Sequence, residues 1–167
     1  MTREGGAPRI GGDTGSRPAA GTRVAVVVAR WNESITRRLL EGARATLVAG
    51  GIEAAAIDEV WVPGSFELPL AADRLAATGR YAAVLCLGAI IRGETVHDRI
   101  IAAAVAAGIE QAGRVHGVPI LFGVLTCETQ AQAEARAGAA PENNKGAESA
   151  AAALEMIALL SRLSSTP

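Results

Sequence analysis

Four short apolar segments alternate with longer segments of helical character along most of this chain. The segments expected to be strands are Val24–Ala29, 54–62, 83–87 and 119–125, and those expected to be helices are 35–49, 66–77, 100–109, 129–137 and 146–163. The first and third strands are continuously apolar, which indicates that both of their faces are covered. Alternation of this kind implies right-handed crossovers, and therefore a parallel sheet with helices on both faces. Neither an internal repeat nor a linker divides residues 23–167, so we expect one α/β domain.

Composition narrows the class of protein further. Hydrophobic residues make up 50% of the chain, the formal net charge is −1, and acidic and basic residues are interspersed. This pattern argues against a nucleic-acid groove and against an anionic membrane surface as partners. No apolar run approaches the roughly 20 residues of a membrane span, and the N-terminus lacks the hydrophobic segment of a signal peptide, so we expect a cytoplasmic protein. Residues 1–22 are rich in small and polar residues without a hydrophobic period, and are expected to be a flexible arm.

The chain lacks the sequence signatures of the common cofactor enzymes. Cys86 lies in an expected core strand and Cys127 follows another, and their positions predict reduced structural thiols rather than a disulfide framework or metal ligands. The glycine spacing of a dinucleotide fingerprint is absent, and so is a Walker A sequence. No cluster of His, Cys and carboxylates suggests a metal. We therefore expect no metal and no redox cofactor.

A glycine-punctuated turn follows the third strand and contains Arg92, Gly93, Glu94, Thr95 and His97. An open parallel sheet binds its ligand beyond the carboxyl ends of its strands, where helix N-termini point free amides at the site. Thr95 is the expected N-cap of the next helix, which places His97 in its first turn. The positive end of the helix dipole favours the neutral imidazole, a usable proton acceptor near neutral pH.

Aromatic residues are scarce, and four of the five are predicted near the carboxyl edge of the sheet: Trp31, Trp61, Phe66 and Phe122. An aromatic-poor protein normally uses such residues in its core, so their position suggests that a planar ring is stacked at this edge. Trp61 and Phe122 fit a core role equally well. Trp31, in a polar loop, is harder to explain as core.

Three charged residues and one histidine have competing interpretations. Glu67 at a helix start can complement the helix dipole or line the site. Arg136, before a glycine-containing loop, is either a solvated cation at a helix end or an anchor for an anion such as phosphate. Lys145 has the same two interpretations, with the surface one favoured. His116, beside Gly117, is expected to be a partner of the helix C-terminus without a catalytic role.

Six separated motifs, taken together, resemble the lumazine synthase family. They are Arg30-Trp31-Asn32-x-x-Ile35-Thr36, residues 62–69 (VPGSFELP), residues 88–97 (GAIIRGETVH), residues 123–126 (GVLT), Arg136-Ala137-Gly138 and Asn144-Lys145-Gly146. One such motif would be weak, but six in the family's order are specific. The resemblance runs from about residue 23 to residue 163, and departs from the family pattern at Val96, at Asp98-Arg99 and at Cys127.

The resemblance implies a three-layer α-β-α fold with a flavodoxin-like four-stranded parallel sheet. It also implies a step of riboflavin biosynthesis, in which 5-amino-6-(D-ribitylamino)uracil condenses with 3,4-dihydroxy-2-butanone 4-phosphate to give 6,7-dimethyl-8-ribityllumazine, phosphate and water. Family members are rings of five subunits with active sites at each subunit boundary, and some close twelve rings into an icosahedral shell. Here the loop at residues 138–144 is slightly longer than in shell-forming members and contains Pro141, which favours a pentamer over a 60-mer.

The same resemblance implies a role for each site residue. Trp31 would stack on the pyrimidine, and His97 would move protons. Ring and ribityl chain would be lined by Ser65, Phe66, Glu67, Ala89, Ile90 and Ile91, and the phosphate would be held by Glu94, Thr95 and Arg136. Phe122, Arg136 and Lys145 would come from the adjacent subunit.

The main alternatives are a non-catalytic flavin- or lumazine-binding protein and a shell-forming paralogue on the same scaffold. Pure ring binding requires neither His97 nor Arg136, so the presence of both favours an enzyme. Particle size would distinguish the shell-forming paralogue.

Overall fold

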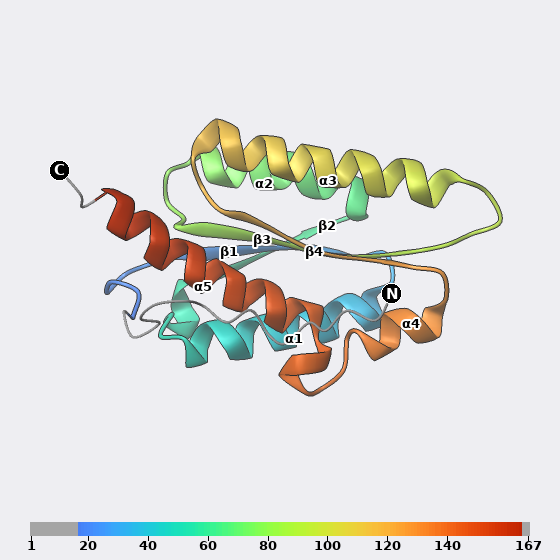
Figure 1. Ribbon diagram of the computed structural model, residues 1–167, viewed down its shortest axis with the longest axis horizontal. Helices are drawn as coiled ribbons and strands as arrows, with labels where there is room; N and C mark the ends of the chain where they lie inside the picture. Colours follow the sequence, from blue (N-terminus) through green and yellow to red (C-terminus); the bar gives the residue numbers. More distant parts are fainter. Residues whose placement is uncertain (1–16, 165–167) are drawn as a thin grey trace.

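The computed structural model describes residues 17–164 (Figure 1). Its strands are β1 (Val24–Ala29), β2 (Ile57–Val62), β3 (Ala83–Ile91) and β4 (Ile120–Cys127). Its α-helices are α1 (Glu33–Ala49), α2 (Leu68–Ala77), α3 (His97–His116), α4 (Gln130–Ala135) and α5 (Lys145–Ser164). Short 3-10 turns occupy Ala54–Ala56, Ser65–Glu67 and Pro141–Asn143.

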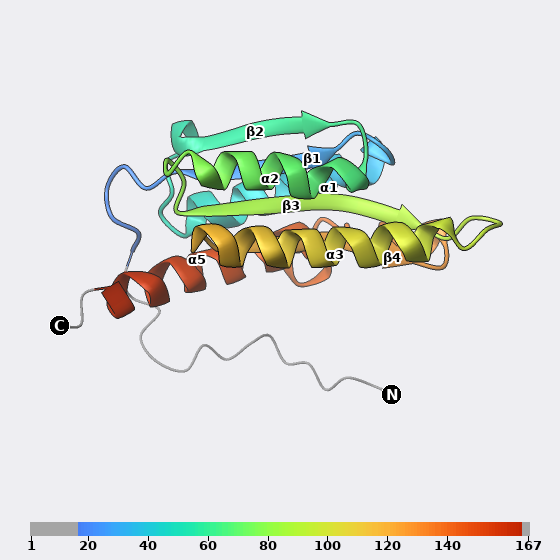
Figure 2. The same ribbon diagram turned by 90° about the horizontal axis from the view of Figure 1, so that it is seen from above.

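The four strands form one parallel sheet in the order β2-β1-β3-β4. Helices α2 and α3 cover one face, and α1, α4 and α5 cover the other (Figures 1 and 2). The expected three-layer α/β fold with a flavodoxin-like parallel sheet is therefore confirmed. Because all four strands run in one direction, their carboxyl ends meet at a single edge of the sheet, where such folds bind ligands.

Two apolar layers hold the helices on the sheet. Residues of β1 are buried without exception and alternate between the layers, because successive side chains of a strand point to opposite faces. Val24, Val26 and Val28 pack with α1 and α5, whereas Ala25, Val27 and Ala29 pack with α2 and α3. The central strands β1 and β3 are continuously apolar in sequence because both of their faces are buried, as predicted.

The third and fourth strands are longer than predicted. We expected β3 to end at residue 87, but it continues to Ile91, opposite Cys127 of β4, and the backbone N–H of Arg92 donates to the Cys127 carbonyl (2.9 Å). Pairing with β4 extends the strand through Gly88, whose lack of a side chain suggested a turn. As a result Ala89, Ile90 and Ile91 belong to the sheet edge rather than to a loop.

Other boundaries also differ from the predictions. Helix α3 spans His97–His116, so it includes the alanine-rich segment 100–109 and runs from the turn after Thr95 to His116, as the expected helix ends implied. The predicted second strand starts only at Ile57, after a 3-10 turn. His116 does not act as a simple helix-end partner: its Nε2 lies 2.7 Å from Asp73 Oδ1 and links α3 to α2.

The start of α5 is pressed against α1. A side chain at Gly146 would place its Cβ 1.9 Å from the carbonyl oxygen of Leu39, so only glycine permits this approach. Nearby, the buried Asn144 donates from Nδ2 to the carbonyls of Arg38 and Gly138 (both 2.9 Å). These contacts position the start of α5 and therefore Lys145, its first residue.

Cys86 is fully buried in β3, where burial strongly raises the pKa of its thiol, and Cys127 is the last residue of β4. Both are free. In residues 17–164 no helix is long and apolar enough to cross a membrane. Most of the expected N-terminal arm, residues 1–16, lies outside the described residues, while Arg17, Pro18, Ala19 and Thr22 line a groove with α5.

Candidate active site

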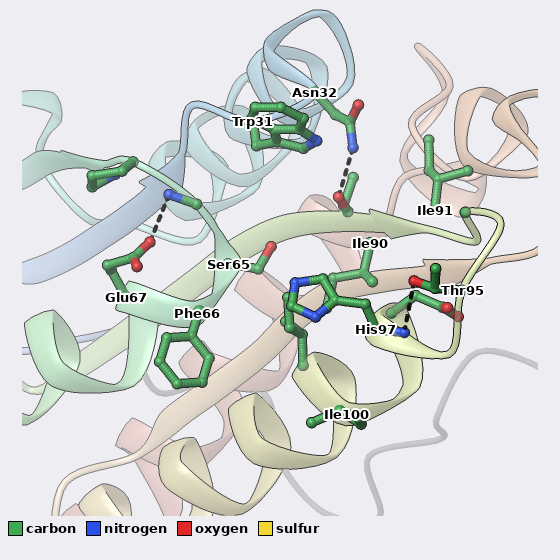
Figure 3. A pocket seen from close by; sticks show the side chains of 16 residues that line it. Trp31, Asn32, Ser65, Phe66, Glu67, Ile90, Ile91, Thr95, His97 and Ile100 are labelled. Atoms are coloured by element: carbon green, nitrogen blue, oxygen red, sulfur yellow. Dashed lines mark hydrogen bonds between the residues drawn. The ribbon is translucent and has the colours of Figure 1, made fainter.

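A cleft of about 700 Å³ opens at the carboxyl edge of the sheet (Figure 3). Three loops, the end of β3 and the start of α3 form it, and it contains most of the predicted site residues. Its lining consists of Trp31, Asn32, Pro63, Gly64, Ser65, Phe66, Glu67, Ala89, Ile90, Ile91, Gly93, Thr95, His97, Asp98, Ile100 and Ile101. Segments that are far apart in the sequence thus converge at the edge predicted from the strand–helix alternation.

Two aromatic side chains of the cleft are unusually exposed. Trp31 is 74% exposed and Phe66 is 61% exposed, although both are large and apolar. Exposed aromatic faces beside apolar walls such as Ile90 suit a planar heterocycle, because stacking and burial of the ring then act together. Trp31 and Phe66 lie at the carboxyl edge of the sheet, as predicted.

The other two aromatics do not belong to this cleft. Trp61 packs against the core on the α1 side of the sheet, with the Arg37 guanidinium 5.0 Å from its ring centre. Phe122 is only the third residue of β4 and lies far from the carboxyl end, so its predicted place at that edge is wrong for this subunit. Its side chain is 36% exposed, and β4 is an edge strand of the sheet formed within residues 17–164.

His97 is the first residue of α3, and its side chain extends from the helix start toward Ser65 and Phe66 (Figure 3). Thr95 is not the N-cap: that position is Val96, and no side chain caps the helix. Thr95 Oγ1 instead accepts a long hydrogen bond from the His97 backbone N–H (3.4 Å). The prediction that His97 lies in the first turn at the cleft is confirmed, whereas the capping residue was off by one position.

Glu67 fits both of its predicted roles, at the start of a helix and in the lining of the cleft. Its Oε2 accepts a hydrogen bond from the Gly64 backbone N–H (2.9 Å), which stabilises the start of the turn before α2. The residue is half-buried and also lines the cleft. Ser65, by contrast, is buried, with its hydroxyl close to Gly88: a Cβ on Gly88 would lie 2.6 Å from Ser65 Oγ. The lack of a side chain at Gly88 therefore lets Ser65 sit against β3.

Asn32 lines the cleft and was missed as a site residue by the sequence analysis. Its Nδ2 donates a hydrogen bond of 2.8 Å to the carbonyl of Ala89 in β3 (Figure 3). Its backbone is left-handed, with φ 61°. The only available signal was its place in the Arg30-Trp31-Asn32 motif, since a hydrogen bond across 57 residues has no local sequence pattern.

Arg136 and Lys145 lie together in a second, smaller pocket of about 370 Å³, away from His97. Arg136 ends α4 and is exposed, and Lys145 begins α5. Lys145 Nζ pairs with Glu148 Oε1 (2.7 Å). Two cations next to a loop can hold an anion, but in a single subunit they do not face the cleft.

The turn between β3 and α3 is exposed and held by one ion pair. Glu94 lies in this turn between Gly93 and Thr95, which line the cleft. Arg92 Nη1 lies 2.5 Å from Glu128 Oε2, and this hydrogen-bonded pairing lowers the pKa of Glu128 and raises that of Arg92. The pair ties the start of the turn to the end of β4.

Within residues 17–164, no group of three or more His, Cys, Asp or Glu side chains is placed to hold a metal ion. The cleft therefore combines exposed aromatic faces, an imidazole and backbone amides at a helix start. Such a set can stack a ring, bind an anion and transfer protons.

Comparison with known proteins agrees with this chemistry. A family profile described as 6,7-dimethyl-8-ribityllumazine synthase matches residues 21–161. A curated relative with the same description, from Thermosynechococcus vestitus (strain NIES-2133 / IAM M-273 / BP-1), is 48% identical over 147 residues, which cover 86% of this chain and 82% of the relative. The matched region includes every residue of the cleft and of the Arg136 pocket, and on this evidence the chain belongs to the 6,7-dimethyl-8-ribityllumazine synthase family.

Proposed function

We propose that this protein is an enzyme of riboflavin biosynthesis that forms 6,7-dimethyl-8-ribityllumazine. It condenses 5-amino-6-(D-ribitylamino)uracil with 3,4-dihydroxy-2-butanone 4-phosphate and releases phosphate and water. Family membership supports the reaction, and the observation that carries it to this chain is the exposed Trp31 in one cleft with His97.

The pyrimidine stacks on Trp31 in this proposal. Ring and ribityl chain then contact the residues that line the adjoining walls, namely Ser65, Phe66, Glu67, Ala89, Ile90 and Ile91. The exposed indole supports this assignment, because a free aromatic face loses unfavourable contact with water when a ring covers it.

The phosphate of the second substrate lies at the turn that holds Glu94 and Thr95, near the free amides at the start of α3. The fork of Arg136 adds a bidentate anchor from the neighbouring subunit. His97, beside this turn, accepts and returns protons while the amine attacks the ketone, the imine loses phosphate and the second amine closes the ring. No metal or redox cofactor takes part in the proposed reaction.

Placement of the substrates supplies much of the acceleration. The amine is already nucleophilic, so holding it against the ketone converts a bimolecular reaction into an effectively unimolecular one. General acid–base catalysis by His97 contributes a further factor of roughly ten to ten thousand.

The proposed active site is completed by a second subunit. Helix α3 exposes Ile100, Ala103, Ala104, Ala106 and Ala107, and a helix with apolar residues outside its buried stripe requires a partner. Phe122, Arg136 and Lys145 are exposed or half-buried on the subunit surface, so those of the adjacent subunit can face the cleft. This arrangement explains why the cleft of one subunit lacks a strong anion anchor.

We further propose that assembly stops at a pentamer. The support is the loop at residues 138–144, where Pro141 opens a 3-10 turn and the Gly138 N–H donates to the Asn143 carbonyl (3.0 Å). Light scattering in dilute neutral buffer distinguishes the outcomes. A mass of about five chains supports the pentamer, about sixty overturns the loop argument, and an active monomer contradicts the shared site.

The reaction itself is tested by incubating the purified protein with both substrates. Lumazine fluorescence should appear together with inorganic phosphate in equal amounts, and omission of either substrate should abolish both signals. Binding of the pyrimidine without product would contradict the proposal. Our proposal also includes the cytoplasm as the compartment, which cell fractionation tests.

A further inference from the structure

Asn32 has an unusual backbone at the mouth of the cleft. With φ 61° and ψ 44° it is the one non-glycine residue with positive φ among the residues described. Asparagine tolerates the left-handed region better than most residues, yet such positions persist only where the surroundings require them. The residue follows Trp31 directly, so its backbone determines where the indole is presented.

The side chain of Asn32 is not used to cap the following helix. The N–H groups of Ile35 and Thr36 donate to the main-chain carbonyl of Asn32 (2.9 and 3.1 Å), and no side-chain cap bond is made. The amide group is therefore available for another purpose. It reaches across to β3 and donates from Nδ2 to the Ala89 carbonyl at 2.8 Å.

This hydrogen bond continues the sheet beyond the end of β1. The register between β1 and β3 ends at Val28 and Leu87, so Ala89 has no backbone partner in β1. On the opposite side, the N–H groups of Arg30 and Trp31 donate to the carbonyls of Val62 and Pro63 (2.9 and 3.2 Å). The loop at residues 30–32 is thus held to both neighbouring segments, and the Asn32 amide makes the hydrogen bond toward β3.

We propose that Asn32 is a positioning residue for the pyrimidine. By bridging to Ala89 it sets the width of the slot between the Trp31 indole and the edge formed by Ala89 and Ile90, in which the ring is held. The proposal rests on the proposed function, because it names what the slot contains. It requires no contact between Asn32 and the substrate.

Substitutions at Asn32 test its hydrogen bond to Ala89 separately from its left-handed backbone. Asn32→Gly keeps the left-handed conformation at no steric cost and removes the amide, while Asn32→Asp removes the Nδ2 donor and keeps a side chain that restrains the backbone. We expect the KM for the pyrimidine to rise about three- to tenfold, as for loss of one partly buried hydrogen bond, with the KM for the butanone phosphate unchanged. Asn32→Asp should behave similarly, because its carboxylate cannot donate to the Ala89 carbonyl.

A second measurement, the fluorescence anisotropy of Trp31, reports on the indole in the absence of substrates. The chain has two tryptophans, so Trp61→Phe leaves Trp31 as the one reporter. In this background Asn32→Gly should lower the fluorescence anisotropy of Trp31 in the ligand-free protein, because the loop has lost its tie to β3. Thermal unfolding of each variant verifies that the fold is retained.

The outcomes separate this proposal from the proposed function. If Asn32→Gly leaves both the pyrimidine KM and the Trp31 anisotropy at their wild-type values, the bridge has no positioning role. If the KM values for both substrates rise equally, the effect is a general loss of structure and the proposal is also wrong. If the wild-type protein forms no lumazine, the proposed function fails, while the anisotropy still tests the bridge.

Discussion

The backbone N–H of Lys145 donates a 2.9 Å hydrogen bond to the carbonyl of Arg136, which joins the two cations at one small pocket. That pocket is separate from the cleft that contains His97. Under the proposed function, in which Arg136 anchors the phosphate and His97 accepts protons, the two groups come together between subunits. This geometry makes the sharing of sites directly testable.

Mixing two impaired variants should restore part of the activity. His97→Ala and Arg136→Ala each impair the site, but a mixed ring contains boundaries where an intact His97 meets an intact Arg136. For random mixing in equal amounts, about one quarter of the boundaries should be restored, since each partner is intact half of the time. Co-refolded mixtures are compared with separately refolded controls. If mixtures are no more active than the average of the two variants, each site lies within one subunit.

His97→Ala should slow lumazine formation by roughly ten- to ten-thousandfold, with substrate affinities nearly unchanged. The chain offers a matched control, because its only other histidine is His116 at the far end of α3, paired with Asp73. Helix α3 has 20 residues, so the two imidazoles lie about 30 Å apart. His116→Gln should keep the wild-type rate. A full rate for His97→Ala across the pH profile would remove it from the mechanism.

Trp31→Ala should weaken binding of the pyrimidine, because stacking contributes about 1 kcal/mol beyond the burial of area. Isothermal calorimetry measures the change, and Trp31→Phe should retain most of the affinity. Trp61→Ala is the control: it removes a ring packed under Arg37, so it should lower the melting temperature without changing affinity. Unchanged affinity in folded Trp31→Ala would contradict the stacking role.

Arg136→Ala should raise the KM for the butanone phosphate far more than that for the pyrimidine. Arg136→Lys should recover only part of the loss, because an ammonium lacks the bidentate fork. Arg114→Ala serves as a control for removal of a surface cation, since Arg114 is exposed on α3 outside both pockets. Equal effects on both substrates would indicate damage to the fold instead of a phosphate anchor.

Asp58 should make stability depend on pH in the acid range. Hydrogen bonds from Arg23 (2.7 Å) and Tyr81 (2.6 Å) lower the pKa of Asp58 below its ordinary value of 3.8. A lowered pKa in the folded state means that the carboxylate stabilises the protein above pH 3.8, and that this contribution is lost as the pH falls through the folded-state pKa.

Asp58→Asn should therefore melt at a lower temperature than the wild type at neutral pH, and the difference should shrink as the pH falls below 3.8. Thermal unfolding between neutral and strongly acid pH measures the difference. Glu53→Gln, in the turn before β2, controls for the change in charge. A difference that stays constant over this range would mean that the carboxylate is not the stabilising group.

The local pattern of apolar residues in the sequence determined the fold class and the edge of the sheet at which the cleft lies. The continuous apolar runs at β1 and β3 and the alternation with helices predicted the parallel sheet, because strands covered on both faces leave no polar alternation. From the direction of the sheet followed its ligand edge, and hence the positions of Trp31 and His97 at the cleft. These inferences succeeded because they depend on periodicity and chain direction, which neighbouring residues encode.

Only the tertiary structure decided which separated residues meet. Phe122 was misplaced because its distance from the carboxyl end of β4 depends on where pairing with β3 begins and ends. The hydrogen bond from Asn32 to Ala89 and the separation of Arg136 from His97 involve partners brought together by the order β2-β1-β3-β4. Such contacts arise from packing between distant segments, and no local propensity specifies them.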